Sequence, residues 1–298
     1  MIAAPVIQTI DLSKAFGSMD AVRGLNLVVE ANKITGFLGR NGAGKSTTIK
    51  MLLGLTRPTK GGGTVLGKNL LDASANREAR MNIAYVAEDK QLYRYLTVED
   101  TIRFTSSFYS DWRANTASKL IKQFELPLSR RVKSLSKGMR TKLALLLAFA
   151  RNPKLLILDE PSEGLDPVMI EQLLHLMVAQ AAQGTAIFFS SHQIAEVERI
   201  ADQVCILNRG SLLLDSSLDR LRESYRRIDI VLSSPTATTD FKMTGVERIH
   251  TDNRTVTIIA SGNTEEIVRR AHTCQASSVE VVPVGLREIF LASVTEEG

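Results

Sequence analysis

The sequence predicts an α/β protein with a parallel sheet covered by helices on both faces, followed by a small α+β domain. Apolar strand segments and helical segments alternate from residue 155 to 207, which is the order of a parallel sheet with crossover helices. Residues 96–150 contain three successive helical segments with no strand between them, which indicates a helical insert. We therefore expect a core domain at residues 1–225, with its insert at about 96–150, and an accessory α+β domain at 226–298.

The composition is that of an ordinary globular protein. The chain has 298 residues, more than one typical domain, of which 44% are hydrophobic and 23% charged. Its net charge of +5 is modest and unclustered. A slightly basic, solvated surface is therefore favoured over a nucleic-acid groove, with room for a weak attraction to anionic lipid headgroups.

Neither a membrane span nor a secretory signal is expected. The apolar run at 143–150 is too short to cross a membrane, and residues 1–10 lack the basic segment of a signal peptide. Cys205 and Cys274 lie far apart and outside any metal-binding spacing, so reduced thiols are favoured. We expect a protein that stays inside the cell.

The N-terminal part of the core predicts short strands separated by turns. Apolar alternation or short apolar runs predict strands at 6–10, 25–29, 34–38, 65–66 and 83–86. Lys14–Gly17 predicts a turn with one exposed aromatic side chain, Phe16. A helix is expected at 46–53, and the glycines at 61–63 predict a loop.

The helical insert begins at a capping signal. Thr97, followed by Glu99 and Asp100, predicts a helix N-terminus, and helical periodicity continues through Phe108. Further helices are expected at 116–124 and 138–150.

The core resumes at 155–160 with a continuously apolar segment, typical of a strand buried on both faces. Beyond it we expect strands at 186–190 and 203–207 and helices at 168–182, 194–200 and 217–224. The tail predicts strands from 228 and at 246–249, 256–259 and 279–282, and helices at 264–272 and 286–292. The Ser/Thr-rich stretch at 233–239 predicts a surface loop.

Residues 39–47 match the phosphate-loop (Walker A) motif G-x-x-x-x-G-K-[ST], between an expected strand and an expected helix. The glycines allow backbone N–H groups to point at phosphate oxygens beside a helix N-terminus. Lys45 would reach the β and γ phosphates, and the Ser46 hydroxyl would bind Mg²⁺. An ordinary Gly-rich turn is the alternative, but the flanking elements favour a nucleotide site. We expect nucleotide contacts from Gly39, Asn41, Gly42, Ala43, Gly44, Lys45, Ser46 and Thr47.

Two carboxylates end the apolar strand at 155–160, where an open α/β sheet binds its ligands. Mg²⁺ held by Ser46 would compensate the buried charge of Asp159. Glu160 would then polarise the attacking water, although a helix-capping role is the alternative. These residues predict a P-loop NTPase of RecA-like fold that depends on Mg²⁺.

Three further segments carry a resemblance to a known family. Leu135–Met139, reading LSKGM, resembles the LSGGQ signature of ATP-binding cassette (ABC) ATPases. Residues 159–167 resemble that family's Walker B strand and D-loop, and Ser190–His192 resembles its switch histidine. Each segment alone is weak, because Ser is a common helix cap and a lone His is usually structural. Their order along residues 1 to about 225 makes the resemblance specific.

The resemblance implies roles around each nucleotide. Phe16 would stack on adenine, in place of the commoner Tyr. Glu88 stands where the family usually has Gln and would contact the metal or the water, beside Ser46 and Asp159. His192 would contact the γ-phosphate and position the water.

The resemblance also implies contacts between subunits. Ser136 and Gly138 would bind the γ-phosphate of ATP held by the opposite subunit, and Asp166 would lie at the dimer seam. Lys137 and Met139 replace the Gly and Gln of the signature, which puts the fine geometry of this contact in question. Because Ser136 and Gly138 remain, a working site is expected in a head-to-tail homodimer.

The leading hypothesis is the ATP-hydrolysing subunit of an ABC transporter at the cytoplasmic face of the membrane. ATP-driven dimerisation would drive separate transmembrane subunits, and the sequence resembles the branch of drug, antibiotic or lipid exporters. The aromatic residues from Tyr85 to Tyr109 would contact those subunits or pack in the core, and both interpretations stay open. The alternatives are a soluble ABC-type ATPase acting on ribosomes or nucleic acid, and a slow regulatory cassette. Relatives that bind ribosomes or DNA usually carry two cassettes, a long coiled-coil insertion or zinc cysteines, which this sequence lacks, so no nucleic acid is expected.

Overall fold

The computed structural model describes residues 4–233 and 241–294. The chain divides into two compact units, Met1–Leu212 and Leu213–Gly298. The boundary expected after residue 225 falls inside the second unit, after helix α8 (Leu218–Ser224). The predicted loop at 233–239 lies, apart from Ser233, outside the described residues.

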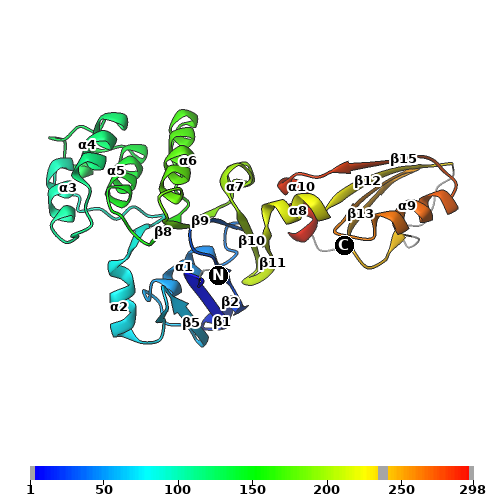
Figure 1. The fold of residues 1–298 in the computed structure, drawn as a ribbon, viewed down its shortest axis with the longest axis horizontal. Coiled ribbons are helices and arrows are strands. Elements are labelled where there is room, and N and C mark those ends of the chain that lie inside the picture. The colour runs from blue at the N-terminus through cyan, green and yellow to red at the C-terminus, as the bar shows by residue number, and fades with distance from the viewer. Residues whose placement is uncertain (1–3, 234–240, 295–298) are drawn as a thin grey trace. The chain divides into compact units, whose positions relative to one another are not determined.

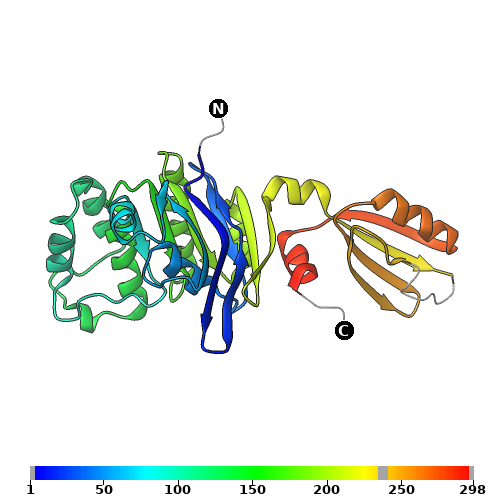
Figure 2. The same cartoon turned by 90° about the horizontal axis from the view of Figure 1, so that it is seen from below.

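The N-terminal part of the first unit forms an antiparallel sheet (Figure 2). Its strands are β1 (Ile7–Phe16), β2 (Met19–Leu25), β3 (Val28–Val29), β5 (Lys60–Val65) and β6 (Lys68–Asn69). The predicted turn at Lys14–Gly17 is wrong in its first part, because β1 continues to Phe16 and turns only after it. Phe16 itself is half exposed, as expected.

The loop predicted at 61–63 is also wrong, because these glycines lie within β5, where Gly62 and Gly63 pair with β1. A Cβ atom at Gly61 would lie 2.0 Å from the Asp11 carbonyl oxygen, and one at Gly63 would lie 2.2 Å from that of Gln8. The glycines therefore permit a close approach of two strands, which glycine composition alone cannot distinguish from a loop.

The second sheet has the order β11-β10-β4-β9-β8-β7; β10, β4, β9, β8 and β7 run parallel and lie in the first unit, and the boundary between the units falls within β11. These strands are β4 (Ile34–Leu38), β7 (Ile83–Val86), β8 (Leu155–Asp159), β9 (Ala186–Ser191), β10 (Gln203–Asn208) and β11 (Ser211–Ser217). Every residue of β4, β8 and β9 is buried, as continuously apolar strands require. Parallel strands end at one edge of the sheet, so the segments that follow β4, β7, β8 and β9 are brought together there.

Helices flank this sheet (Figure 1). α6 (Pro167–Ala181) and α7 (Ile194–Ile200) pack on β4 and β9, whereas α1 (Lys45–Leu52) packs on β8 and β2. A further helix, α2 (Ala73–Met81), was not predicted. Only Asn76 and Ala79 of this helix are buried, so its sequence carries little apolar periodicity.

The helical insert contains α3 (Val98–Ser106), α4 (Ala114–Gln123), a short 3₁₀ turn at Val132–Ser134 and α5 (Lys137–Phe149). Figure 1 shows α3, α4 and α5 gathered beside the sheets. Thr97 caps α3 as predicted, since its hydroxyl accepts from the Asp100 N–H at 3.0 Å. Helix α3 ends at Ser106, so Phe108 lies beyond it.

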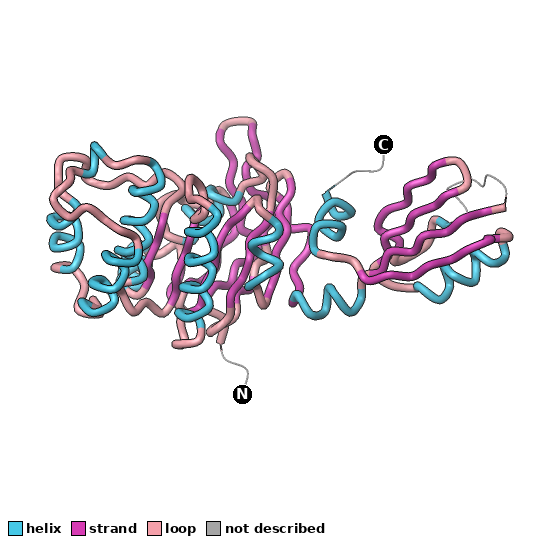
Figure 3. Tube along the Cα trace, turned by 90° about the horizontal axis from the view of Figure 1, so that it is seen from above, coloured by secondary structure: helices cyan, strands magenta, loops and turns pink. Residues whose placement is uncertain are grey.

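The second unit pairs four antiparallel strands in the order β13-β14-β12-β15 (Figure 3). They are β12 (Arg226–Leu232), β13 (Val246–Asp252), β14 (Thr255–Ala260) and β15 (Ala276–Pro283). Helix α9 (Thr264–Thr273) packs on β12 and β15, and α10 (Leu286–Val294) contacts β13 and β14. A separate cluster of buried side chains, including Ile228, Ile258 and Ile267, forms the core of this α+β unit.

Candidate functional site

The phosphate loop follows β4 and runs directly into α1. Gly42 and Gly44 have φ angles of 80° and 107°, in the left-handed region that glycine tolerates. A Cβ atom at Gly44 would also lie 2.4 Å from the Ala21 carbonyl oxygen. The loop therefore curls tightly, as a backbone cradle for phosphate oxygens requires.

A pocket of about 290 Å³ opens over this loop. It is lined by the phosphate-loop residues Asn41, Gly42, Gly44, Lys45, Ser46 and Thr47, together with Phe16, Met19, Asp20, Ala21, Glu88 and Glu160. Phe16 thus lines the same pocket as the phosphate loop, and its stacking on a base stays a prediction. The Lys14 ammonium is 4.9 Å from the centre of the Phe16 ring, which adds a cation–π contact.

Asp159 ends β8 and is buried. The Ser190 hydroxyl, at the end of the neighbouring strand β9, donates to Asp159 Oδ1 at 2.6 Å. Burial raises the pKa of the Asp159 carboxyl, while hydrogen bonds from Ser190 and Ser46 lower it in part. The Ser46 hydroxyl also donates to Glu88 Oε2 at 3.3 Å, so two carboxylates and a hydroxyl converge beside the phosphate loop.

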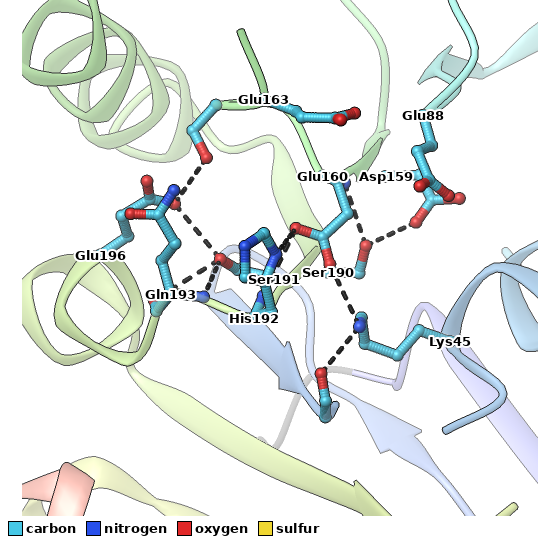
Figure 4. Close-up of polar contacts among 12 residues, drawn as sticks. Lys45, Glu88, Asp159, Glu160, Glu163, Ser190, Ser191, His192, Gln193 and Glu196 are labelled. Carbon is cyan, nitrogen blue, oxygen red and sulfur yellow. Dashed lines mark hydrogen bonds and ion pairs between the residues drawn. The ribbon is translucent and has the colours of Figure 1, made fainter. Parts of the chain in front are cut away.

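Glu160 is the residue on which the site converges (Figure 4). Its Oε1 lies 3.1 Å from Lys45 Nζ at ion-pair distance, and its Oε2 lies 2.8 Å from His192 Nδ1. The Glu160 N–H donates to the Ser190 hydroxyl at 3.1 Å. Figure 4 shows His192 on one side of the carboxylate and Lys45 on the other. The ends of β8 and β9 and the start of α1 thus bring together the three residues predicted to be catalytic.

Several neighbours of Glu160 were not predicted from the sequence. The Lys90 ammonium donates to the Glu160 carbonyl oxygen at 3.2 Å, and burial lowers its pKa. Glu196, in α7, is buried and accepts from the Ser162 hydroxyl at 3.0 Å and the Ser191 hydroxyl at 3.3 Å. Burial raises the pKa of the Glu196 carboxyl. No short sequence motif marks these contacts, because each joins residues on separate elements.

The residues expected to act across a dimer lie elsewhere on the first unit. Ser136 is exposed and caps α5, accepting from the Met139 N–H at 3.2 Å. Asp166 is exposed and caps α6, accepting from the Met169 N–H at 3.0 Å. Along the described chain, the lining of the phosphate-loop pocket includes neither of them, nor Gly138. Both caps thus face outward from the subunit.

The chemistry of the donors fits Mg²⁺. Among the described residues, no group of three or more His, Cys, Asp or Glu side chains forms a metal site by itself. Ser46, Glu88 and Asp159 instead offer oxygen donors at the mouth of the phosphate loop. Magnesium is usually held in this way, by one or two carboxylates together with substrate phosphates and water.

An exposed aromatic patch, formed by Tyr93, Tyr95, Phe104 and Phe108, lies on the helical insert and the segment before it. Neighbouring rings are 4.9–5.9 Å apart. Tyr85 and Tyr109 are part-buried instead and line an adjacent pocket of about 350 Å³, whose wall is largely apolar. Arg151 stacks on the Tyr109 ring at 3.7 Å.

The chain is similar to ATP-binding proteins of ABC transporters. The family model for ABC transporter matches residues 22–163. The bacitracin transport ATP-binding protein BcrA of Bacillus licheniformis is 36% identical over 225 residues, which span 74% of this chain and 73% of that protein.

Solved structures of ABC ATPases are also similar to this chain. An ATP-binding subunit of an ABC transporter is 34% identical, with a TM-score of 0.67, over 73% of this chain and 92% of that chain. The cassette MJ0796, solved as a dimer bound to ADP and Pi, is 20% identical with a TM-score of 0.64, over 71% of this chain and 98% of that chain. The similarity to MJ0796 is one of fold alone. The two structures together confirm the predicted P-loop NTPase fold.

Proposed function

The chain belongs to the family of ABC transporter ATP-binding proteins, whose activity is ATP hydrolysis, and we propose that it powers an exporter through separate transmembrane subunits. The observation that carries this proposal is the convergence of Lys45, Glu160 and His192 beside the phosphate loop. The similarity to a bacitracin transport protein supports export of a drug-like or antibiotic-like cargo.

Each residue of this site has a distinct role in binding or hydrolysing ATP. Backbone N–H groups of the phosphate loop and Lys45 bind the β and γ phosphates, and Phe16 stacks on the adenine. Glu160 accepts the proton of the attacking water, since it lies deep in the site with a carboxylate oxygen fixed by His192. The imidazole positions that water and contacts the γ-phosphate. Lys45 holds the other carboxylate oxygen, so the Glu160 side chain is oriented from two directions.

Ser46, Asp159 and Glu88 would hold Mg²⁺, which supplies positive charge to phosphate oxygens during phosphoryl transfer. The buried Asp159 carboxylate needs such a partner, because burial penalises its charged form. Glu88 brings a second carboxylate to a position where the family usually has an amide.

Two copies of the chain complete each other's sites. Ser136 and Asp166 are exposed caps at the starts of α5 and α6, so a second subunit can reach them. Ser136 and Gly138 would contact the γ-phosphate of ATP bound to the partner, and Asp166 would lie at the seam. The dimeric cassette of similar fold supports this head-to-tail homodimer. ATP then joins the subunits, and hydrolysis releases them.

The aromatic patch and the adjacent pocket are the surface for the transmembrane partner. Four large exposed aromatic side chains beside a largely apolar pocket favour a partner over solvent. No helix among the described residues is long and apolar enough to cross a bilayer. We propose that the chain reaches the cytoplasmic face of the membrane through this partner.

Co-purification tests the proposal. The tagged chain is expressed in its own host and isolated from detergent-solubilised membranes, and we expect an integral membrane protein to be retained with it. Changing Phe104 and Phe108 to Ser should lose it. Changing Val178, which is exposed on α6, to Ser is the matched control and should retain it. Retention by the Phe104→Ser/Phe108→Ser variant would contradict the assigned surface, and salt-sensitive nucleic-acid binding in place of membrane-protein binding would contradict the transporter assignment.

A further inference from the structure

Lys137 and Glu163 form an ion pair between two functional segments of one subunit. Lys137 directly follows Ser136 at the start of α5, and Glu163 lies in the loop that follows Glu160. Lys137 Nζ lies 2.6 Å from Glu163 Oε1. The hydrogen bond from Lys137 is the main cause that lowers the pKa of the Glu163 carboxyl. Lys137 is one of the two positions where the chain departs from the family's signature.

A hydrogen bond and a close packing contact, each to a backbone carbonyl oxygen, join the same segments. The Thr141 hydroxyl, one turn along α5, donates to the Glu163 carbonyl oxygen at 3.3 Å. A Cβ atom at Gly138 would lie 2.7 Å from the Gly164 carbonyl oxygen, so the first turn of α5 packs directly on the loop. We call this set of residues, Lys137, Gly138 and Thr141 with Glu163 and Gly164, the loop–helix joint.

The joint lies between residues that serve different nucleotides. Ser136 is adjacent to Lys137 in the chain and would touch the ATP held by the partner. Glu160 is on the same short loop as Glu163 and would accept the proton of the water that attacks the ATP of its own subunit. Glu160 is in turn held by Lys45 and His192, so a shift of the loop reaches the hydrolytic residues.

We propose that Lys137 and Glu163 are positioning residues that couple the two nucleotide sites of the dimer. When Ser136 engages the partner's nucleotide, the ion pair transmits the position of α5 to the loop that carries Glu160. The inference rests on the proposed composite dimer. It also assigns Lys137 a contact within its own subunit, rather than a contact with the partner's phosphate.

A double-mutant cycle tests this pair. Lys137→Gln, Glu163→Gln, the double variant and the charge-swapped Lys137→Glu/Glu163→Lys are compared in ATPase assays over a range of ATP concentrations. Each single change should lower kcat by about twofold to fivefold, the scale of a part-exposed ion pair, and lower the Hill coefficient with KM little changed. The double Gln variant should resemble each single variant, because the pair acts as a unit, and the charge swap should restore both parameters towards wild type.

Other results would overturn the inference. A raised KM in Lys137→Gln alone, not rescued by the charge swap, would place Lys137 on the partner's phosphate. Additive effects of the two Gln changes would show that the pair does not act as a unit. The matched control is the ion pair of Arg199 with Glu171, which joins α7 to α6, and its neutral variants should leave the Hill coefficient unchanged.

The test separates this inference from the proposed dimer. If Glu160→Gln with ATP forms a dimer but the cycle shows no coupling, only the role of Lys137 and Glu163 is wrong. If Glu160→Gln stays monomeric with ATP and wild-type hydrolysis shows a Hill coefficient of one, the composite dimer is wrong and the coupling is overturned with it.

Discussion

At the scale of single residues, Glu160 is held from several directions. Its carboxylate lies between Lys45 and His192, its N–H donates to Ser190, and its carbonyl oxygen accepts from Lys90. Its φ angle of 47° is uncommon for a residue with a side chain. Such restraint fixes a carboxylate in one place, which is what a general base needs.

Replacing Glu160 with Gln should lower ATP turnover by about 10²–10⁴-fold, because the amide cannot accept a proton from water. Binding of ATP should persist, since the phosphate loop is unchanged. Steady-state hydrolysis and nucleotide titration check the two expectations. Unchanged turnover would remove Glu160 from the mechanism.

Glu196 offers a second residue-scale prediction. Glu196→Ala should lower the free energy of unfolding by about 1–3 kcal/mol, because the buried hydroxyls of Ser162 and Ser191 lose their acceptor. Glu196→Gln keeps an acceptor and should cost less. Denaturant unfolding of the two variants measures the difference, and equal losses would show that the hydrogen bonds do not matter.

The contribution of Glu196 to the free energy of unfolding should depend on pH, and the sign of that dependence follows from the direction of its pKa shift. Burial raises the pKa of Glu196 in the folded state, with Glu160 raising it and His192 lowering it as nearby charges. The folded protein therefore binds this proton more tightly than the unfolded chain. The stabilisation that this proton provides is complete at pH values below 4.5, the ordinary pKa of a Glu carboxyl. It is lost as the pH rises towards the pKa of the folded state. Denaturant unfolding at several pH values should show wild type losing stability relative to Glu196→Gln as the pH rises through this range. A difference in free energy of unfolding that stays constant with pH would contradict the raised pKa.

At the scale of elements, the ends of parallel strands assemble the site. β4 leads to the phosphate loop, β7 to Glu88, β8 to Asp159 and β9 to His192. Because β4, β9, β8 and β7 are neighbours in the sheet, segments far apart in sequence meet at one edge. The antiparallel sheet adds Phe16 at the end of β1.

Gly61 tests the close pairing of β5 with β1. Gly61→Ala should lower the free energy of unfolding by about 2–5 kcal/mol, from left-handed strain and from collision with the Asp11 backbone. Gly67 is the matched control: its φ is 73° and nothing lies within 4 Å of its Cβ position, so Gly67→Ala should cost only about 1–2 kcal/mol. Equal costs by denaturant unfolding would contradict the close strand contact.

At the scale of the whole molecule, the proposed function needs a second copy of the chain. One subunit holds a complete phosphate loop, whereas its signature residues Ser136 and Gly138 lie outside that pocket. The second unit has a buried core of its own. Because each phosphate loop would need the signature residues of a second copy, dimerisation is expected to depend on bound nucleotide.

Glu160→Gln should form a dimer when ATP is added, because bound ATP is not consumed. Adding Ser136→Arg should abolish that dimer, since a bulky side chain would occupy the partner's phosphate contact. Size-exclusion chromatography with light scattering measures the mass with and without ATP. A strict monomer at high protein concentration would contradict the composite site.

Sequence patterns predicted most elements, with specific exceptions. Helix α7 has the predicted bounds, and α5, α6 and α9 differ from prediction by a residue at one or both ends. Helix α2 was missed because only two of its residues face the core. The glycines of β5 were taken for a loop because only the pairing with β1 reveals why glycine is needed there.

The sequence by itself determined the family and predicted the nucleotide site, because the phosphate loop, the acidic strand end and the signature are short motifs whose residues lie on one turn or at one strand end. Only the tertiary structure decided which side chains restrain Glu160. Lys137 meets Glu163 across 26 positions of sequence, and Ser162 meets Glu196 across 34. Such pairs depend on how the sheet edge and helices are packed in space, and no local pattern encodes that packing.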